Sequence, residues 1–127
     1  MTASKRFGLW LPVVCYTGFI FWLSSAPRTI PGISRFPWLD KPIHAVEYLP
    51  LGFLLLRAIL RSWGRLPVNQ GRGWAAAGAF AVAALDELYQ RTIPLRSASP
   101  FDVMADFAGA LLGQLLYQRK MKRPEAP

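Results

Sequence analysis

From Phe7 to Ala26 the sequence carries no charged side chain, and this run most restricts how the chain can fold. At about 1.5 Å per helical residue, it is long enough to cross a hydrocarbon core of about 30 Å. A cleaved signal peptide is the competing interpretation, because Lys5 and Arg6 precede the run and small residues end it. Pro27 would follow the cleavage site and block cleavage, and the run is longer than a usual signal core. We therefore predict a retained transmembrane helix.

The rest of the chain contains further apolar segments, separated by loops rich in proline and glycine. Hydrophobic residues make up 53% of the 127 residues and charged residues only 17%, which is too little charged surface for a small soluble domain. The sequence predicts a single all-α membrane domain over 1–127, folded as a bundle of four transmembrane helices. The expected helices lie near 7–26, 42–60, 74–91 and 101–118, with loops over 27–41 and 62–73.

The basic residues flank the apolar segments and predict which side of the membrane each loop faces. Ten Lys and Arg side chains lie on the N-terminal tail, around the second loop and on the C-terminal tail, against five around the first and third loops. Because cytoplasmic loops carry the excess of Lys and Arg, both ends of the chain are predicted to be cytoplasmic. The formal net charge of +8 does not indicate nucleic acid, since no basic run is interleaved with aromatic side chains that would stack on bases.

Small residues predict where the helices approach one another closely. Gly109 and Gly113 form a small-xxx-small pattern in the fourth segment, and residues 75–79 are all alanine or glycine. Cys15 is the only cysteine, so an intramolecular disulfide is excluded. We expect Cys15 to pack as a small apolar side chain.

Ionisable side chains within the later apolar segments are the candidate functional residues. A charge at the centre of a membrane helix costs about 2.5–3.5 kcal/mol on insertion scales, so such residues are functional candidates by default. In the predicted topology the second and fourth helices run inward and the third runs outward, so their polar faces converge in the outer half of the bundle. The residues are Asp40, His44, Glu47 and Tyr48 of the second segment, Asp86, Glu87 and Gln90 of the third, and Asp102 and Asp106 of the fourth.

Two of these positions have more than one interpretation. His44 with Asp86 or Glu87 would make a general acid–base pair, since a carboxylate orients an imidazole and raises its proton affinity. The same contact would otherwise be a hydrogen bond that locks two helices together. Arg96, in the third loop, has the fork of N–H groups that binds a phosphate or carboxylate, or else it is a structural counter-ion of Asp86, Glu87 or Asp106.

Two other kinds of site are disfavoured. Ser97 or Ser99 with His44 and a carboxylate would supply the residue types of a nucleophilic triad, but no nucleophile-elbow pattern is present. Ser99 is also placed to cap the fourth helix. A metal site built from His44 and the carboxylates has suitable ligand types, but the sequence lacks HExxH or another metal-ligand spacing. We therefore predict no metal and no other cofactor.

Three runs of the sequence resemble the motifs of the VanZ-like family in order and spacing: Asp40–Gly52, Asp86–Gln90 and Pro94–Gly109. That family comprises small bacterial membrane proteins named after a protein linked to teicoplanin resistance. Two positions depart from it, with Leu95 in place of the usual glycine and Asp106 in place of the usual asparagine. The resemblance implies an envelope-related role in the bacterial inner membrane. It points to Asp40, Lys41, His44, Tyr48, Asp86, Glu87, Gln90, Pro94, Arg96, Ser97, Asp102 and Gly109 as motif positions.

These features predict an outward-facing polar pocket that engages the anionic head of an envelope lipid or of a lipid-linked cell-wall precursor. Membrane lipids are the expected partners, and nucleic acid is not. Two rival functions are a non-catalytic accessory subunit and a proton-coupled transporter. The transporter is disfavoured because the polar groups do not continue into the cytoplasmic half of the helices. The candidate catalytic residues are His44, Asp86 and Glu87, and the candidate ligand-binding residues are Lys41, Tyr48, Gln90, Arg96, Ser97, Asp102 and Asp106.

Overall fold

The computed structural model describes residues 2–26 and 37–122, and over these ranges it is helical without a β-strand. The elements are α1 (Ala3–Ser25), a short 3-10 turn η2 (Pro37–Leu39), α2 (Asp40–Ser62), α3 (Val68–Gln90) and α4 (Pro100–Lys122). The all-helical class is therefore confirmed for this part of the chain. Most of the predicted first loop, with Arg28 and Arg35, and the C-terminal tail from residue 123 lie outside the described residues.

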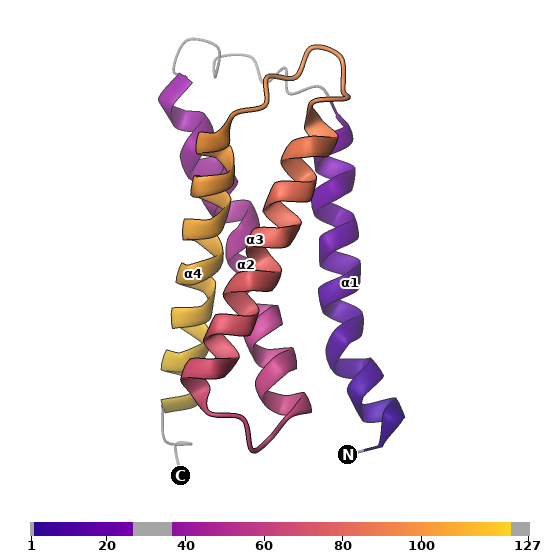
Figure 1. Cartoon of the computed structure of the whole chain (residues 1–127), viewed down its shortest axis with the longest axis vertical. Helices are drawn as coiled ribbons and strands as arrows, with labels where there is room; N and C mark the ends of the chain where they lie inside the picture. Colours follow the sequence, from indigo (N-terminus) through magenta and orange to yellow (C-terminus); the bar gives the residue numbers. More distant parts are fainter. Residues whose placement is uncertain (1, 27–36, 123–127) are drawn as a thin grey trace.

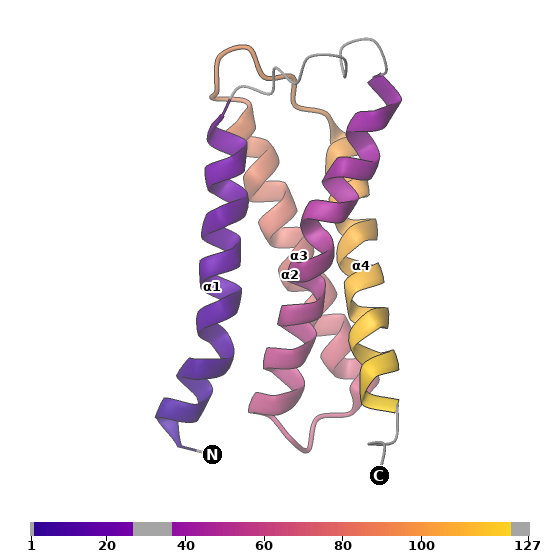
Figure 2. The ribbon, with the colours of Figure 1, turned by 180° about the vertical axis from the view of Figure 1, so that it is seen from behind.

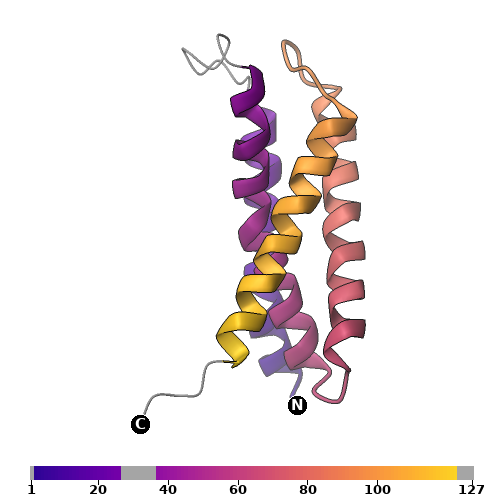
Figure 3. The ribbon, with the colours of Figure 1, turned by 90° about the vertical axis from the view of Figure 1, so that its left-hand side faces the viewer.

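The helices form an up-and-down bundle (Figure 1). The start of α1, the end of α4 and the α2–α3 loop lie at one end, and the α3–α4 loop lies at the other, as the reverse view also shows (Figure 2). The most extensive helix contact is between α2 and α4, while α1 packs against α2 and α3. From the side, α4 runs obliquely to α3 and diverges from it towards the C-terminal end (Figure 3).

The boundaries differ most from prediction at α3, which begins at Val68 and not near Trp74. Pro67 occupies the N-cap position in an extended conformation, and its carbonyl oxygen accepts the backbone N–H of Gly71 at 3.0 Å. Gly71, expected in a loop, is therefore a buried helical residue, and a Cβ there would collide with the Leu60 side chain. The glycine serves close packing here and does not break the helix. Two buried alanines of the predicted small-residue run, Ala75 and Ala79, continue the same face.

Three glycines explain why α2 and α4 lie so close together. A Cβ on Gly109 would collide with the carbonyl group of Ala45, and a Cβ on Gly113 with that of Leu49. In the opposite direction, a Cβ on Gly52 would collide with the backbone of Ala110. These are backbone contacts, which cannot be relieved by a change of rotamer. The predicted Gly109-xxx-Gly113 pattern is thus a close helix contact.

Each α-helix has 23 residues and is therefore about 34 Å long. By length and composition, α1 and α2 are apolar enough to cross a membrane. The sequences of α3 and α4 are more polar, yet their exposed side chains include many large apolar ones. On these two helices the exposed apolar residues include Trp74, Phe80, Leu85, Leu88, Phe101, Met104, Leu112, Leu115 and Leu116.

The distribution of polarity is therefore inverted relative to a soluble bundle. Buried positions of α3 and α4 hold carboxylates and amides, while apolar side chains face outwards. A soluble bundle shows the opposite arrangement, with charged residues outside and apolar residues inside. Cys15, expected to be packed inside, is also exposed, on the outer surface of α1. Its segment is apolar on several faces, so the sequence alone did not show which face turns inwards.

Candidate functional site

Polar side chains of α2, α3 and α4 are buried together at the end of the bundle that carries the α3–α4 loop. We refer to this group as the polar cluster. Five of its ionisable side chains are at most 5% exposed, and ionisable groups are rarely buried so completely unless they are paired: His44, Asp86, Glu87, Asp102 and Asp106. Its members are Asp40, Lys41, His44 and Tyr48 of α2, Asp86, Glu87 and Gln90 of α3, and Asp102 and Asp106 of α4.

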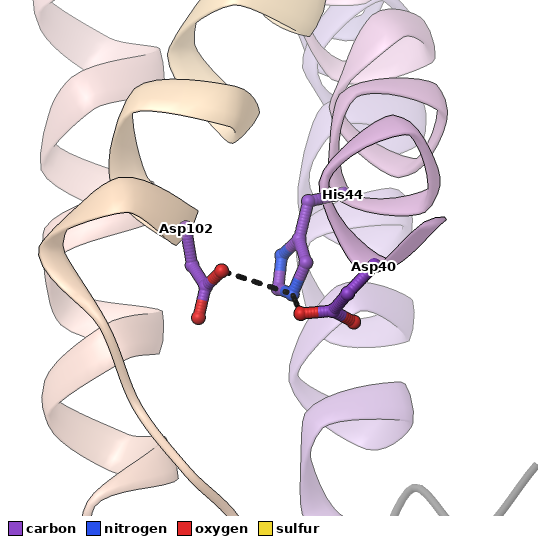
Figure 4. Close-up of side chains that lie close together, drawn as sticks. All are labelled: Asp40, His44 and Asp102. Atoms are coloured by element: carbon purple, nitrogen blue, oxygen red, sulfur yellow. Dashed lines mark ion pairs between the residues drawn. The ribbon is translucent and has the colours of Figure 1, made fainter. Parts of the chain in front are cut away.

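His44 is the centre of the part of the cluster between α2 and α4. Its Nδ1 lies 2.9 Å from Oδ1 of Asp106, a hydrogen-bond distance between two side chains that are 3% and 2% exposed. Its other ring nitrogen, Nε2, lies 3.7 Å from Oδ2 of Asp40 and 3.9 Å from Oδ1 of Asp102. The imidazole thus stands between two carboxylates, one from each helix (Figure 4). A third carboxylate, that of Asp106, fixes the orientation of the ring.

Lys41 supplies a positive charge next to this group. Its Nζ forms an ion pair with Oδ1 of Asp102 and lies 3.7 Å from Oδ2 of Asp40. The Asp102 side chain is 3% exposed, whereas those of Lys41 and Asp40 are 40% and 31% exposed. The cluster is therefore buried on its α4 side and open to the surroundings beside Lys41.

A second polar contact lies between α1, α2 and α3. The Tyr48 hydroxyl donates to Oδ2 of Asp86 at 3.3 Å, and Nε2 of Gln90 donates to the same oxygen at 2.9 Å. Nε2 of Gln90 also lies 3.2 Å from Oγ of Ser24, which joins α1 to the network. Ser24 was not predicted as a site residue. Its position near the end of the first apolar run, at the depth of the other polar groups, was the available signal.

Two carboxylates of α3 are incompletely satisfied. Neither oxygen of Glu87 has a hydrogen-bond partner among the described residues, and the same holds for Oδ1 of Asp86. The closest approach of a cation recorded for Glu87 is Arg91, whose Nη2 lies 3.8 Å from Oε1. Buried carboxylate oxygens without hydrogen bonds are costly, so these groups need protons or an additional ligand.

The structure places three other carboxylates against His44 than the two suggested by the sequence, Asp86 and Glu87. The imidazole lies beside Asp40, Asp102 and Asp106. The close glycine contact between α2 and α4 brings the start of α4 against the His44 face. Asp86 instead meets Tyr48, one turn further along α2.

Arg96 lies over the end of α1. Its Nη1 donates to the carbonyl oxygens of Leu23, Ser24 and Ala26, at 3.3, 3.0 and 2.9 Å. These carbonyls belong to the last turn of α1 and its C-cap, where the helix leaves acceptors unpaired and where a positive charge is favourable. The arginine therefore holds α1 against the α3–α4 loop, a structural role that the sequence analysis did not predict.

The two serines of this loop do not form a triad in the structure. Ser97 is exposed. Oγ of Ser99 accepts the backbone N–H of Phe101 at 3.2 Å, which is the predicted N-cap of α4.

Gln114 is a second residue that the sequence analysis missed. It is fully buried in α4, two turns beyond Asp106, and neither atom of its amide has a hydrogen-bond partner among the described residues. Buried polar groups therefore continue further into the bundle than predicted, although the deeper one is not ionisable. Glutamine in an apolar segment was the available signal, since amides inside membrane helices seek partners.

The comparison with known families agrees with this picture. The model of the VanZ/LLP1 family matches residues 9–121, which include every motif position named above. This chain belongs to the VanZ/LLP1 family. No curated protein and no solved structure matches it. Membership of the VanZ/LLP1 family and the two apolar helices together indicate a membrane protein.

The structure shows how each departure from the VanZ-like motifs fits its position in this VanZ/LLP1 protein, poorly at Leu95 and well at Asp106. Leu95 has φ 64°, the left-handed region in which glycine is unstrained, so the usual glycine would suit this position better. Asp106 offers Oδ1 to Nδ1 of His44. The side-chain oxygen of an asparagine would accept the same hydrogen bond.

Proposed function

We propose that this VanZ/LLP1 protein crosses the bacterial inner membrane four times, with both ends in the cytoplasm. Its polar cluster would then face outwards and engage the anionic head of an envelope lipid or of a lipid-linked cell-wall precursor. The observation that supports this most directly is that ionisable side chains are buried inside one end of the bundle, while large apolar side chains cover its outer surface. Such residues inside membrane proteins are enriched at ligand and proton sites.

The charge distribution supports the proposed orientation. The end opposite the polar cluster holds the start of α1, the ends of α2 and α4, and the start of α3. The described basic residues there are Lys5, Arg6, Arg57, Arg61, Arg65, Arg72, Arg119, Lys120 and Lys122. An excess of Lys and Arg marks the cytoplasmic side. The outward-facing apolar side chains of α3 and α4 support membrane crossing by these helices too.

The contacts suggest a role for each residue. Lys41 is the partly exposed cation of the cluster, so its ammonium group can turn from Asp102 to an arriving phosphate or carboxylate. The His44–Asp106 pair can hold and transfer a proton at Nδ1 or Nε2. Glu87 is a buried carboxylate without a hydrogen bond among the described residues, and it is the second group in this region suited to proton transfer. Arg96 would act by holding α1 beside the site.

An accessory subunit and a transporter remain the rival functions. Gln114 extends the buried polar groups beyond the cluster, which removes one argument against a transporter. An amide does not titrate, however, so Gln114 does not by itself continue a proton relay. Proton flux in liposomes, compared between wild type and Glu87→Gln, separates transport from a site that opens at one end.

The test of the proposal uses reconstituted protein and a total lipid extract of a bacterial envelope, with lipid masses followed by mass spectrometry. Wild type is compared with a His44→Ala, Glu87→Gln double variant. Arg61→Gln is the control, because it removes an exposed charged side chain of α2 at the end of the bundle opposite the polar cluster. We expect wild type and the control to retain or convert one class of anionic lipid. The double variant should retain or convert at least about tenfold less of it. Equal retention by all three proteins, with no mass change, would exclude the proposed site.

A link to glycopeptide resistance is part of the same proposal. Expression in a teicoplanin-sensitive bacterium is expected to raise resistance with wild type and not with the double variant at equal protein levels.

A further inference from the structure

We propose that Asp40, His44 and Asp102 bind a divalent metal ion, and that Zn²⁺ is the ion whose coordination preferences they match best. This goes beyond the lipid-binding proposal and does not depend on it. Each residue offers one ligand atom, and the ligand atoms lie within 4.8 Å of one another. The sequence analysis disfavoured a metal because no metal-ligand spacing is present. In the structure two of the ligands lie on α2 and the third on α4, so their spacing along the chain does not show the site (Figure 4).

The three proposed ligand atoms are spaced nearly as closely as the ligands of one metal ion. The distances from Nε2 to the carboxylate oxygens of Asp40 and Asp102, 3.7 and 3.9 Å, are too long for hydrogen bonds. Ligands of a tetrahedral Zn²⁺ at about 2.0–2.2 Å lie roughly 3.4 Å apart. Small side-chain rotations would therefore bring the three atoms to coordinating distance. One coordination position would remain for water or for an oxygen of a ligand.

The orientation of the imidazole provides the second argument. A histidine that binds a metal through one nitrogen commonly donates a hydrogen bond to a carboxylate through the other, which fixes the tautomer and the direction of the ring. Here Nδ1 contacts Oδ1 of Asp106, and Nε2 is thereby directed towards Asp40 and Asp102. Asp106 would be the positioning residue of the site.

The charge of the region provides an independent third argument. Glu87 is 5% exposed, lacks a hydrogen bond among the described residues, and is close enough to Asp102, Asp106 and His44 to interact with their charges. Among the described residues, the carboxylates of Asp102, Asp106 and Glu87 outnumber the two cations recorded beside them, Lys41 and Arg91. Buried negative charges in excess require compensation. A divalent cation at Nε2 would supply it.

The ammonium group of Lys41 would compete with a metal ion for Asp102. Its Nζ is paired with Oδ1 of Asp102, the same oxygen that would bind the metal. Because its side chain is 40% exposed, the ammonium group can turn outwards when a metal enters. A bound ion and the displaced Lys41 would then form two adjacent positive charges, which would suit a phosphate or pyrophosphate group.

The experiment titrates ZnCl₂ into the untagged full-length protein in nanodiscs after treatment with a chelator. Affinity is measured by competition with a zinc-sensitive dye, and the metal content by elemental analysis. Wild type is expected to bind about one Zn²⁺ per chain. Asp40→Asn and Asp102→Asn remove a ligand and should each weaken zinc binding by more than about tenfold. Asp106→Asn changes only the partner of the histidine and should weaken zinc binding by at most about 100-fold. Arg61→Gln, at the opposite end of the bundle, should bind as wild type does.

A further variant separates loss of ligands from loss of the fold. Lys41→Met removes the competing ammonium group and leaves all three ligands, so zinc is expected to bind more tightly than to wild type. Circular dichroism of each variant reports whether the helices persist. The proposal is overturned if wild type retains no zinc, in which case protons compensate the buried carboxylates. It is equally overturned if the Asp40→Asn and Asp102→Asn variants bind zinc as tightly as wild type. Because the probe is the metal alone, neither result depends on the lipid assay.

Discussion

His44 shows how one side chain can be predicted as a candidate while its nearest partners cannot. Its residue type and its place in an apolar segment made it a candidate. Its partner depends on which helix lies closest, and that helix is α4, which brings Asp102 and Asp106 to the ring. Arg96 is a similar case, since its carbonyl acceptors belong to α1, far from it in the sequence.

At the same scale, Leu95 is expected to be a strained residue whose replacement stabilises the protein. It is 92% exposed and has φ 64°, a conformation that costs L-residues roughly 1–2 kcal/mol. Leu95→Gly should therefore raise the free energy of unfolding by about 0.5–1 kcal/mol, after allowance for the greater entropy of glycine in the unfolded chain. Thermal or denaturant unfolding in detergent measures the change.

The matched control is Leu85→Gly, an exposed leucine more than one turn from either end of α3. Glycine in the interior of a helix costs about 1 kcal/mol, so this change should destabilise the protein. If both leucine-to-glycine changes lowered stability by the same amount, the backbone of Leu95 would not be strained.

At the scale of elements, the contact between α2 and α4 positions the part of the cluster around His44. Gly52, Gly109 and Gly113 allow backbone-to-backbone approach, and Asp106 lies one turn before Gly109 on α4. The glycines have no ionisable group, yet they decide whether Asp106 reaches His44. Sequence analysis found the Gly109-xxx-Gly113 pattern but could not identify the facing residues, because the pattern does not specify its partner helix.

Gly109→Ala is expected to separate α2 from α4 and weaken the polar cluster. The added methyl group would meet the Ala45 carbonyl, and overpacking of this kind costs about 1–3 kcal/mol or more when backbone must move. We expect a lower unfolding temperature and a longer distance between spin labels on the two helices. Gly18→Ala is the control, since nothing lies within 4 Å of its added methyl group. An equal loss of stability in both variants would contradict close packing at Gly109.

At the scale of the whole molecule, the protein places apolar side chains outside and ionisable side chains inside. The average composition of α3 and α4 hides this arrangement, because their carboxylates and small residues are buried and their leucines and aromatics are exposed. α1 completes the bundle through side-chain contacts along its length. Trp10 donates to Ser62, Tyr16 donates to the carbonyl oxygen of Glu47, and Ser24 meets Gln90.

The proposed topology predicts which positions are accessible from outside the cell. In a Cys15→Ala background, a single cysteine at Ser97, in the α3–α4 loop, should react with a membrane-impermeant maleimide in intact cells. A single cysteine at Arg65, in the α2–α3 loop, should react only after permeabilisation. Both positions are exposed in the structure. Labelling of both in intact cells, or the reverse order, would overturn the proposed orientation.

The helical class, the N-cap at Ser99, the close-packing Gly109-xxx-Gly113 pattern, the family and the ionisable residues within the apolar segments could all be predicted from the amino-acid sequence. These features depend on composition and on spacings within one segment, which a linear sequence displays directly. The contact of His44 with Asp106, the position of Arg96 over the end of α1, the exposure of Cys15 and the burial of Gln114 became known from the packed helices alone. Each of these depends on how far a helix is rotated about its axis and on which neighbour it approaches. Those two quantities follow from packing between segments, and no single segment encodes them.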